Sequence, residues 1–106
     1  MMSDYIEVHT TIDSIEGAQK IADALVSQRL AACVQVSGPI KSTYWWEGKM
    51  EITEEWVCTA KTRHDLYAMV EETIKTAHSY DVPEILAVKI EDGNQAYLAW
   101  MAQETS

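Results

Sequence analysis

Two hydrophobic periodicities alternate along this chain, and their order restricts the possible folds more than any other feature. Alternate positions from Ile6 to Ile12 are suited to burial, which is the pattern of a strand with one buried face. Asp13 and Glu16 then form a D-x-x-E capping box, and apolar residues follow at helical spacing from Ile15 to Val26. We therefore predict a strand followed directly by an amphipathic helix of about 14 residues.

The segment after Arg29 predicts a long β-hairpin. The run LAACVQV is short and β-branched, so it is typical of a strand. Gly38-Pro39 predicts a bulge, a bend or an exposed edge, because proline has no amide hydrogen for a ladder. The chain then continues in extended form to a turn at Glu47-Gly48, and the third strand runs from Lys49 to about Lys61.

A second helix, a further strand and a short last helix complete the pattern. Thr62 and Asp65 form a T-x-x-D cap, after which one helical face carries Leu66, Met69, Val70, Ile74 and Ala77. Val82-Pro83 begins the strand, whose alternate residues are predicted to point inward: Leu86, Val88 and Ile90. Asn94 caps the last helix after a turn at Asp92-Gly93.

The order β-α-β-β-α-β, followed by a helix, predicts an α+β fold of the ferredoxin-like type. In this split βαβ arrangement both main helices cover one face of an antiparallel sheet. A chain of 106 residues has room for one core, so residues 1–106 form a single domain.

Charge and cysteine content restrict the partners. The chain has 8 Lys and Arg against 17 Asp and Glu, a net charge of -9, which disfavours nucleic acid and anionic membrane surfaces and favours cations. We find no signal peptide and no long apolar segment, so we expect a cytoplasmic protein. In that compartment Cys33 and Cys58 are expected to be free thiols.

The hairpin is too long for the domain that carries it. Each limb has about 14 residues and spans roughly 45 Å, against strands of five or six residues in typical domains. A two-residue turn at Glu47-Gly48 places Trp45 opposite Met50 on one face. Tyr44 and Trp46 lie on the other face, so both faces carry large apolar groups.

Two interpretations explain these aromatic side chains. In the first, another copy of the chain covers them, because an isolated ribbon with two apolar faces is marginal in water. In the second, the tryptophans pack on the last helix of their own domain, where Trp100 lies. Limb length and the two apolar faces favour the first interpretation.

No established catalytic or metal motif is present, and nothing in the spacing pairs a cysteine or serine with a histidine. The densest polar cluster is HSYDVPE, which places His78, Tyr80 and Glu84 between a helix and a strand and suits a small ligand or a cation. The alternative is a histidine favoured at a helix C-terminus, followed by turn residues. The residues alone slightly favour this alternative.

Five segments together resemble the CutA divalent-cation-tolerance family, in the same order and over nearly the whole chain: RLAACV at 29–34, YWWEGK at 44–49, AKTR at 60–63, HSYDVPEI at 78–85 and GNQAYLAW at 93–100. The resemblance implies a ferredoxin-like subunit in a homotrimer similar in architecture to the PII signalling proteins. Together with the length and the two apolar faces of the hairpin, the resemblance predicts a trimer interface that includes Tyr44, Trp45, Trp46 and Trp56. It implies no catalytic activity and no required cofactor, with Cu(2+) or another divalent cation as a candidate ligand.

The copper ligands of bacterial members carry over only in part. They include a cysteine at the end of the first strand and a His-His pair, and the corresponding residues here are Thr10 and Ala77-His78. Thiolate and imidazole suit copper, so these replacements weaken such a site. Cys33 matches the family and is expected to point away from the helices, toward a partner subunit or a cleft.

These observations lead to two main hypotheses about function. The first is a non-enzymatic, trimeric tolerance protein that binds a divalent metal through His78, Cys33 and Glu84. The second is a PII-like sensor with a small metabolite in an intersubunit pocket lined by the same three residues, Lys61 and Tyr80. A small enzyme that uses His78, Tyr80 or Cys33 is a third and weaker possibility.

Overall fold

A computed structural model describes residues 5–106 and confirms the predicted order of strands and helices. The elements are β1 (Tyr5–Ile12), α1 (Ile15–Ser27), β2 (Cys33–Trp46), β3 (Lys49–Arg63), η1 (His64–Leu66), α2 (Tyr67–Ala77), β4 (Ile85–Lys89) and α3 (Gln95–Glu104). The ferredoxin-like α+β class is therefore confirmed.

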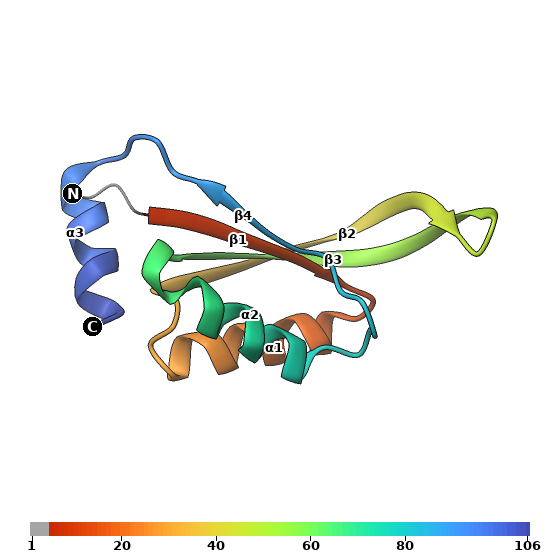
Figure 1. Cartoon of the computed structure of the whole chain (residues 1–106), viewed down its shortest axis with the longest axis horizontal. Coiled ribbons are helices and arrows are strands. Elements are labelled where there is room, and N and C mark those ends of the chain that lie inside the picture. The colour runs from red at the N-terminus through yellow and green to blue at the C-terminus, as the bar shows by residue number, and fades with distance from the viewer. Residues whose placement is uncertain (1–4) are drawn as a thin grey trace.

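The four strands form one antiparallel sheet in the order β2-β3-β1-β4, and α1 and α2 lie on the same face of it (Figure 1). The core lies between these two layers, where Val8, Ile21 and Val70 are almost completely buried. We call the other side of the sheet the open face. Register places Glu7, Lys61 and Cys33 in one row across the open face, because Glu7 pairs with Lys61 and Lys61 pairs with Cys33.

Two of the three predicted helix caps are wrong. The cap of α1 is Ser14, whose hydroxyl accepts the Gly17 N–H at 2.9 Å, because a side chain at that position reaches the N–H three residues ahead and Asp13 lies one residue too early. Thr62 belongs to β3, where its hydroxyl donates to the Leu30 carbonyl at 2.6 Å. β3 continues to Arg63, and α2 begins only after a 3-10 turn, without a side-chain cap.

The prediction that Leu86 and Val88 point inward is also wrong. These side chains are 58% and 52% exposed, since Leu86 pairs with His9 and Val88 with Glu7 on the open face. Ile85 and Ala87 instead share the helix side with Thr10 and Val8. Alternation along a short strand shows that two faces differ, but only the register with β1 decides which of them meets the helices.

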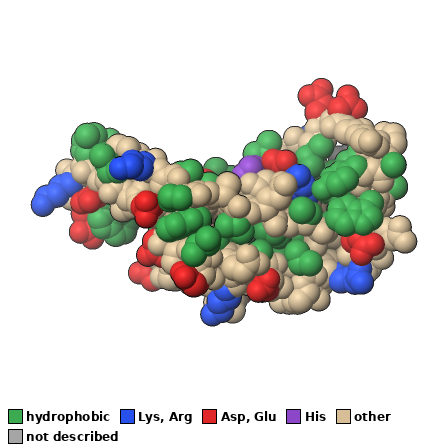
Figure 2. Space-filling model, turned by 180° about the vertical axis from the view of Figure 1, so that it is seen from behind, with side chains coloured by type: hydrophobic (Ala, Val, Ile, Leu, Met, Phe, Trp, Pro, Cys, Tyr) green, Lys and Arg blue, Asp and Glu red, His purple; other side chains and the backbone are tan. Residues whose placement is uncertain are grey.

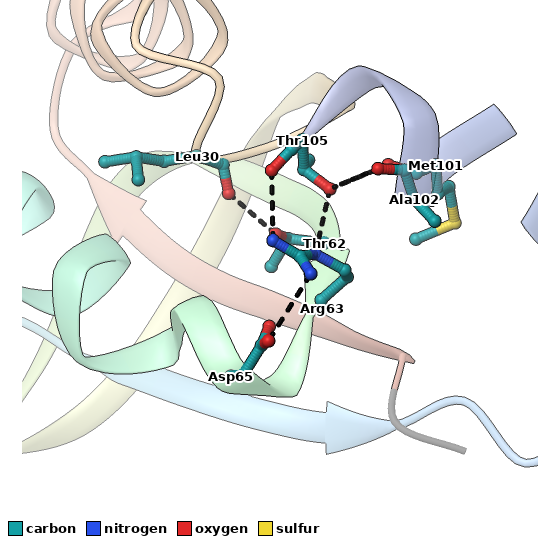
Figure 3. Close-up of polar contacts among 7 residues, drawn as sticks. All are labelled: Leu30, Thr62, Arg63, Asp65, Met101, Ala102 and Thr105. Atoms are coloured by element: carbon teal, nitrogen blue, oxygen red, sulfur yellow. Dashed lines mark hydrogen bonds and ion pairs between the residues drawn. The ribbon is translucent and has the colours of Figure 1, made fainter. Parts of the chain in front are cut away.

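The helix α3 lies beside the end of β3 and is held there by hydrogen bonds. Arg63 donates from Nε to the Thr105 hydroxyl at 3.1 Å and from Nη2 to the Thr105 carbonyl at 3.0 Å (Figure 3). Arg29 donates from Nη1 to the Glu104 carbonyl at 3.1 Å. The predicted Asn94 cap is confirmed, because its side chain accepts from the N–H groups of Ala96 and Tyr97.

Beyond the end of β1, residues 40–55 pair only with one another and project as a two-stranded arm (Figure 1). The predicted irregularity at Gly38-Pro39 is present as a register shift between Ser37 and Ile40. Glu47 and Gly48 both have positive φ, as a tight hairpin turn requires. The arm gives the molecule a long axis of 45 Å against 25 and 22 Å for the other two.

The aromatic side chains of the arm are not covered by their own domain. Trp45 is 73% exposed and Trp46 is 58% exposed. The last helix, with Trp100, lies at the opposite end of the molecule (Figure 1). The interpretation that these two tryptophans pack on the last helix is therefore wrong.

Candidate functional site

The loop after α2 is fixed to β1 by His78. Its Nε2 lies 2.8 Å from the Thr11 carbonyl oxygen, and its Nδ1 lies 3.1 Å from the Tyr80 backbone nitrogen. A carbonyl only accepts and a backbone N–H only donates, so the ring is the neutral tautomer with its proton on Nε2. Both nitrogens are thus engaged, and neither has a lone pair free for a metal ion.

This arrangement brings the side chain of Tyr80 to the carboxylate of Glu55. The Tyr80 hydroxyl donates to Glu55 Oε2 at 2.7 Å. Burial raises the pKa of Tyr80 above its ordinary value, and the hydrogen bond and negative charge of Glu55 add to this. Tyr80 therefore stays protonated at neutral pH and serves Glu55 as a donor.

Glu55 is the functional candidate that sequence reasoning missed. It is only 6% exposed, and among the described residues it forms no ion pair. The run EITEEW offers three carboxylates, and nothing in their order shows that the third is the buried one. The one indication in the sequence was Tyr80 in the HSYDVPE segment, because the hydroxyl of a packed tyrosine needs a polar partner.

The predicted metal ligands Cys33, His78 and Glu84 are not brought together within one chain. Cys33 shares a row with Glu7, whereas His78 bonds to Thr11, four residues farther along β1, so more than about 13 Å separates them. Glu84 is exposed just before β4. Within residues 5–106, no group of three His, Cys, Asp or Glu side chains is placed to hold a metal ion.

Thr10, which stands where the resemblance places a copper-binding cysteine, also does not complete a metal site. Thr10 is fully buried on the helix side, where its hydroxyl has no hydrogen-bond partner among the described residues. Cys33 lies on the open face, as expected, and is half-buried. The two positions therefore lie on opposite sides of the sheet.

Lys61 lies at the end of the open face that is distant from Tyr80. It is half-buried, and its Nζ is 5.8 Å from the centre of the Tyr97 ring. The predicted pocket residues thus form two groups, with Cys33 and Lys61 at one end of the sheet and His78 and Tyr80 at the other. Glu84 lies beside the second group in sequence, without a hydrogen bond to either member among the described contacts.

The four aromatic residues assigned to a subunit interface also form two groups. Tyr44, Trp45 and Trp46 are exposed on the arm, and Figure 2 shows apolar side chains at the surface of the arm and of the body. Trp56 is half-buried and packs on the core of its own chain, next to Gly38. No helix in the described part of the chain is long and apolar enough to cross a membrane.

Comparisons with known proteins agree with this fold. A family model described as CutA1 divalent ion tolerance protein matches residues 6–104. The divalent-cation tolerance protein CutA of Pyrococcus horikoshii is 41% identical over 100 residues, which cover 94% of this chain and 97% of that protein. The chloroplastic protein CutA 1 of Oryza sativa is 40% identical over 100 residues, and this chain spans 56% of its length.

Solved structures give the same result. The crystal structure of CutA1 from Oryza sativa has a TM-score of 0.95 and 39% identity, covering 97% of this chain and 94% of that chain. The structure of CutA from Xylella fastidiosa has a TM-score of 0.96 and 34% identity, covering 98% of this chain and 100% of the other. The chain belongs to the CutA1 divalent ion tolerance protein family.

Proposed function

We propose that this chain acts in divalent-cation tolerance as a homotrimer with no catalytic activity of its own. The family supports the biological role, since the description of its model and the names of relatives state divalent ion tolerance. No observation favours the small-metabolite sensor, so we do not propose it.

The arm is the observation that supports assembly. Its apolar side chains are exposed on both faces: Trp45 73%, Met50 66%, Ile52 63% and Trp46 58%. Leu86 and Val88 add exposed apolar area on the open face. Apolar surface of this extent is typical of an interface, and further copies of the same chain cover it most simply.

Sedimentation equilibrium at micromolar concentration tests the assembly directly. A homotrimer is expected to give three times the mass of the 12.0 kDa chain. A monomer over the whole concentration range would contradict the proposal.

We propose Cu(2+), or another divalent cation, as the ligand, at a site that Cys33, His78 and Glu84 of different copies complete. Within one chain these residues do not form a metal site. Cys33 is half-buried on the open face, and Glu84 is exposed just before the edge strand β4. Copper accepts thiolate and imidazole donors, and the His78 ring would provide a nitrogen only by giving up one of its two hydrogen bonds.

Calorimetric titration of the metal-free trimer with Cu(II) tests this site. Cys33→Ser is expected to lower the affinity by at least about tenfold, since even the loss of a residue that only orients a metal ligand costs about 10–100-fold, and His78→Ala is expected to lower it as well. Equal affinities of the wild type and both variants, or no binding at micromolar metal, would show that the site is assigned wrongly.

A further inference from the structure

Glu55 has a buried negative charge whose only side-chain partner in the described residues is the neutral hydroxyl of Tyr80. Removing a carboxylate from water is costly unless a positive charge or several hydrogen bonds compensate for it. A cationic partner is therefore missing from the single chain. Within one chain a bound metal ion is not that partner, because the described residues provide no group of three metal-ligating side chains.

The position of Glu55 identifies the kind of molecule that approaches it. Glu55 is at the root of the arm, on the open face, because it lies an even number of residues from Val57, Thr59 and Lys61 along β3.

Glu55 shares its face of the hairpin with Tyr44 and Trp46, because these pair with Glu51 and Lys49, each an even number of residues from Glu55. A copy that lies along this face from the tip of the arm to the open face therefore also packs beside the Glu55 carboxylate. The cation that meets Glu55 is then expected to come from that copy.

One lysine of the chain is suited to this role. Arg29, Arg63 and Lys75 already form ion pairs with carboxylates. Five lysines do not: Lys20, Lys41, Lys49, Lys61 and Lys89. Of these five, only Lys61 is half-buried, and its side chain lies on the open face.

Lys61 and Glu55 cannot meet within one chain. They are six residues apart on the same strand, a separation of roughly 20 Å. In a head-to-tail ring, one end of the face of each copy contacts the other end of the face of its neighbour, and two complementary groups at opposite ends of that face then meet.

We propose that Glu55 of one copy and Lys61 of the next form a buried ion pair between subunits. The pair rests on the proposed homotrimer and gives it specificity, because apolar contacts alone fix the relative position of two copies only loosely. Tyr80, oriented by His78, holds the Glu55 carboxylate in place for the incoming ammonium group.

A double-mutant cycle on trimer dissociation tests the pair, with dissociation constants measured by sedimentation at fixed salt. Glu55→Gln and Lys61→Gln are each expected to raise the dissociation constant by at least about tenfold, since close charge pairs at interfaces couple by more than about 1.4 kcal/mol. In the double variant the dissociation constant is expected to rise by a factor at least about tenfold smaller than the product of the two factors measured for the single variants. Matched controls are Glu72→Gln on α2 and Lys20→Gln on α1, which neutralise exposed charges on the helix side of the sheet, away from the arm and the open face, and leave the dissociation constant unchanged.

The possible results separate the two proposals. A trimeric wild type whose two variants act independently would overturn the ion pair but not the homotrimer, whereas a monomeric wild type would overturn both. If Glu55→Gln does not fold, Lys61→Glu provides the test, because it places two carboxylates together. It is expected to weaken assembly at least about tenfold more than Lys61→Gln, and equal losses would contradict the pair.

Discussion

The imidazole of His78 joins two segments that are distant in sequence, the end of β1 and the loop before β4. Replacing His78 with Ala leaves the Thr11 carbonyl and the Tyr80 N–H without partners. We expect the free energy of unfolding to fall by about 1–3 kcal/mol, the cost of losing partners of buried polar groups. Urea denaturation measures this, with Ser79→Ala at an exposed neighbouring position as the control. An unchanged stability of His78→Ala would exclude this structural role.

The thiol of Cys58 makes stability depend on pH in the alkaline range. Burial between β3 and α1 raises the pKa of Cys58 from 9.0 to about 11, and its Sγ donates to the Ala18 carbonyl at 3.5 Å. Because the folded-state pKa is the higher one, the unfolded chain loses its proton first. The stabilisation is therefore complete below pH 9 and is lost as the pH rises from 9 through about 11.

The variant Cys58→Ala separates this effect from other titrations. Between pH 9 and 11 its free energy of unfolding is expected to fall less than that of the wild type, by up to about 3 kcal/mol, since one pKa unit corresponds to about 1.4 kcal/mol. Every other ionisable group is present in both proteins, so its contribution cancels in the comparison. Parallel pH profiles of the two proteins would contradict this origin.

The candidate site shows which residue-level facts the sequence could predict. The segment around His78 and Tyr80 is recognisable as a dense polar cluster, and the structure does place both side chains in one hydrogen-bonded group. The partners of the two His78 nitrogens, the Thr11 carbonyl and the Tyr80 N–H, depend on the fold, so the sequence alone could not show that both nitrogens are engaged. Glu55 was not predicted, because its burial depends on the position of Tyr80, which is 25 residues away in sequence.

At the scale of elements, the hairpin depends on Gly38. This residue has φ +152, and a Cβ placed on it would lie 2.6 Å from Trp56 Cδ1. We expect Gly38→Ala to lower the free energy of unfolding by about 1–3 kcal/mol through backbone strain, with the clash in addition. Gly48→Ala is the matched control, because Gly48 also has positive φ, at +81, but a Cβ placed on it would have no other atom within 4 Å among the described residues.

Thermal denaturation of the two variants checks this difference. Gly48→Ala is expected to cost only the backbone term, about 1–2 kcal/mol, and Gly38→Ala clearly more. Equal losses in the two variants would mean that Trp56 moves aside without cost. The contact between Gly38 and Trp56 would then have no role in positioning the arm.

Element order was predictable because each strand and helix carries its own periodicity, and the two-residue turn at Glu47-Gly48 fixed the hairpin register. Cap positions were less predictable. Asp13, with its D-x-x-E pattern, and Ser14 are adjacent, and either could be the N-cap of α1 by sequence alone. The orientation of β4 was not predictable, because Leu86 and Val88 have the apolar character of a core but face the side that the single chain leaves open.

At the scale of the whole molecule, substitutions in the arm test whether its exposed apolar surface is used for assembly. We expect the double variant Trp45→Ser/Trp46→Ser to keep its fold, because both side chains are mainly exposed in the single chain. Its trimer dissociation constant is expected to rise at least about thirtyfold, as the loss of an aromatic hot spot at an interface does. Sedimentation equilibrium measures the constant, and circular dichroism checks the fold.

Met69→Ser is the matched control for this experiment. Met69 is 56% exposed, close to Trp46 at 58%, but it lies on α2, on the helical side of the molecule. If apolar exposure alone drove self-association, both variants would weaken it. If assembly uses the arm, Met69→Ser assembles like the wild type and only the arm variant dissociates. An arm variant that remains as trimeric as the wild type would mean that copies meet elsewhere, and the open face with Leu86 and Val88 would then have to provide the contact alone.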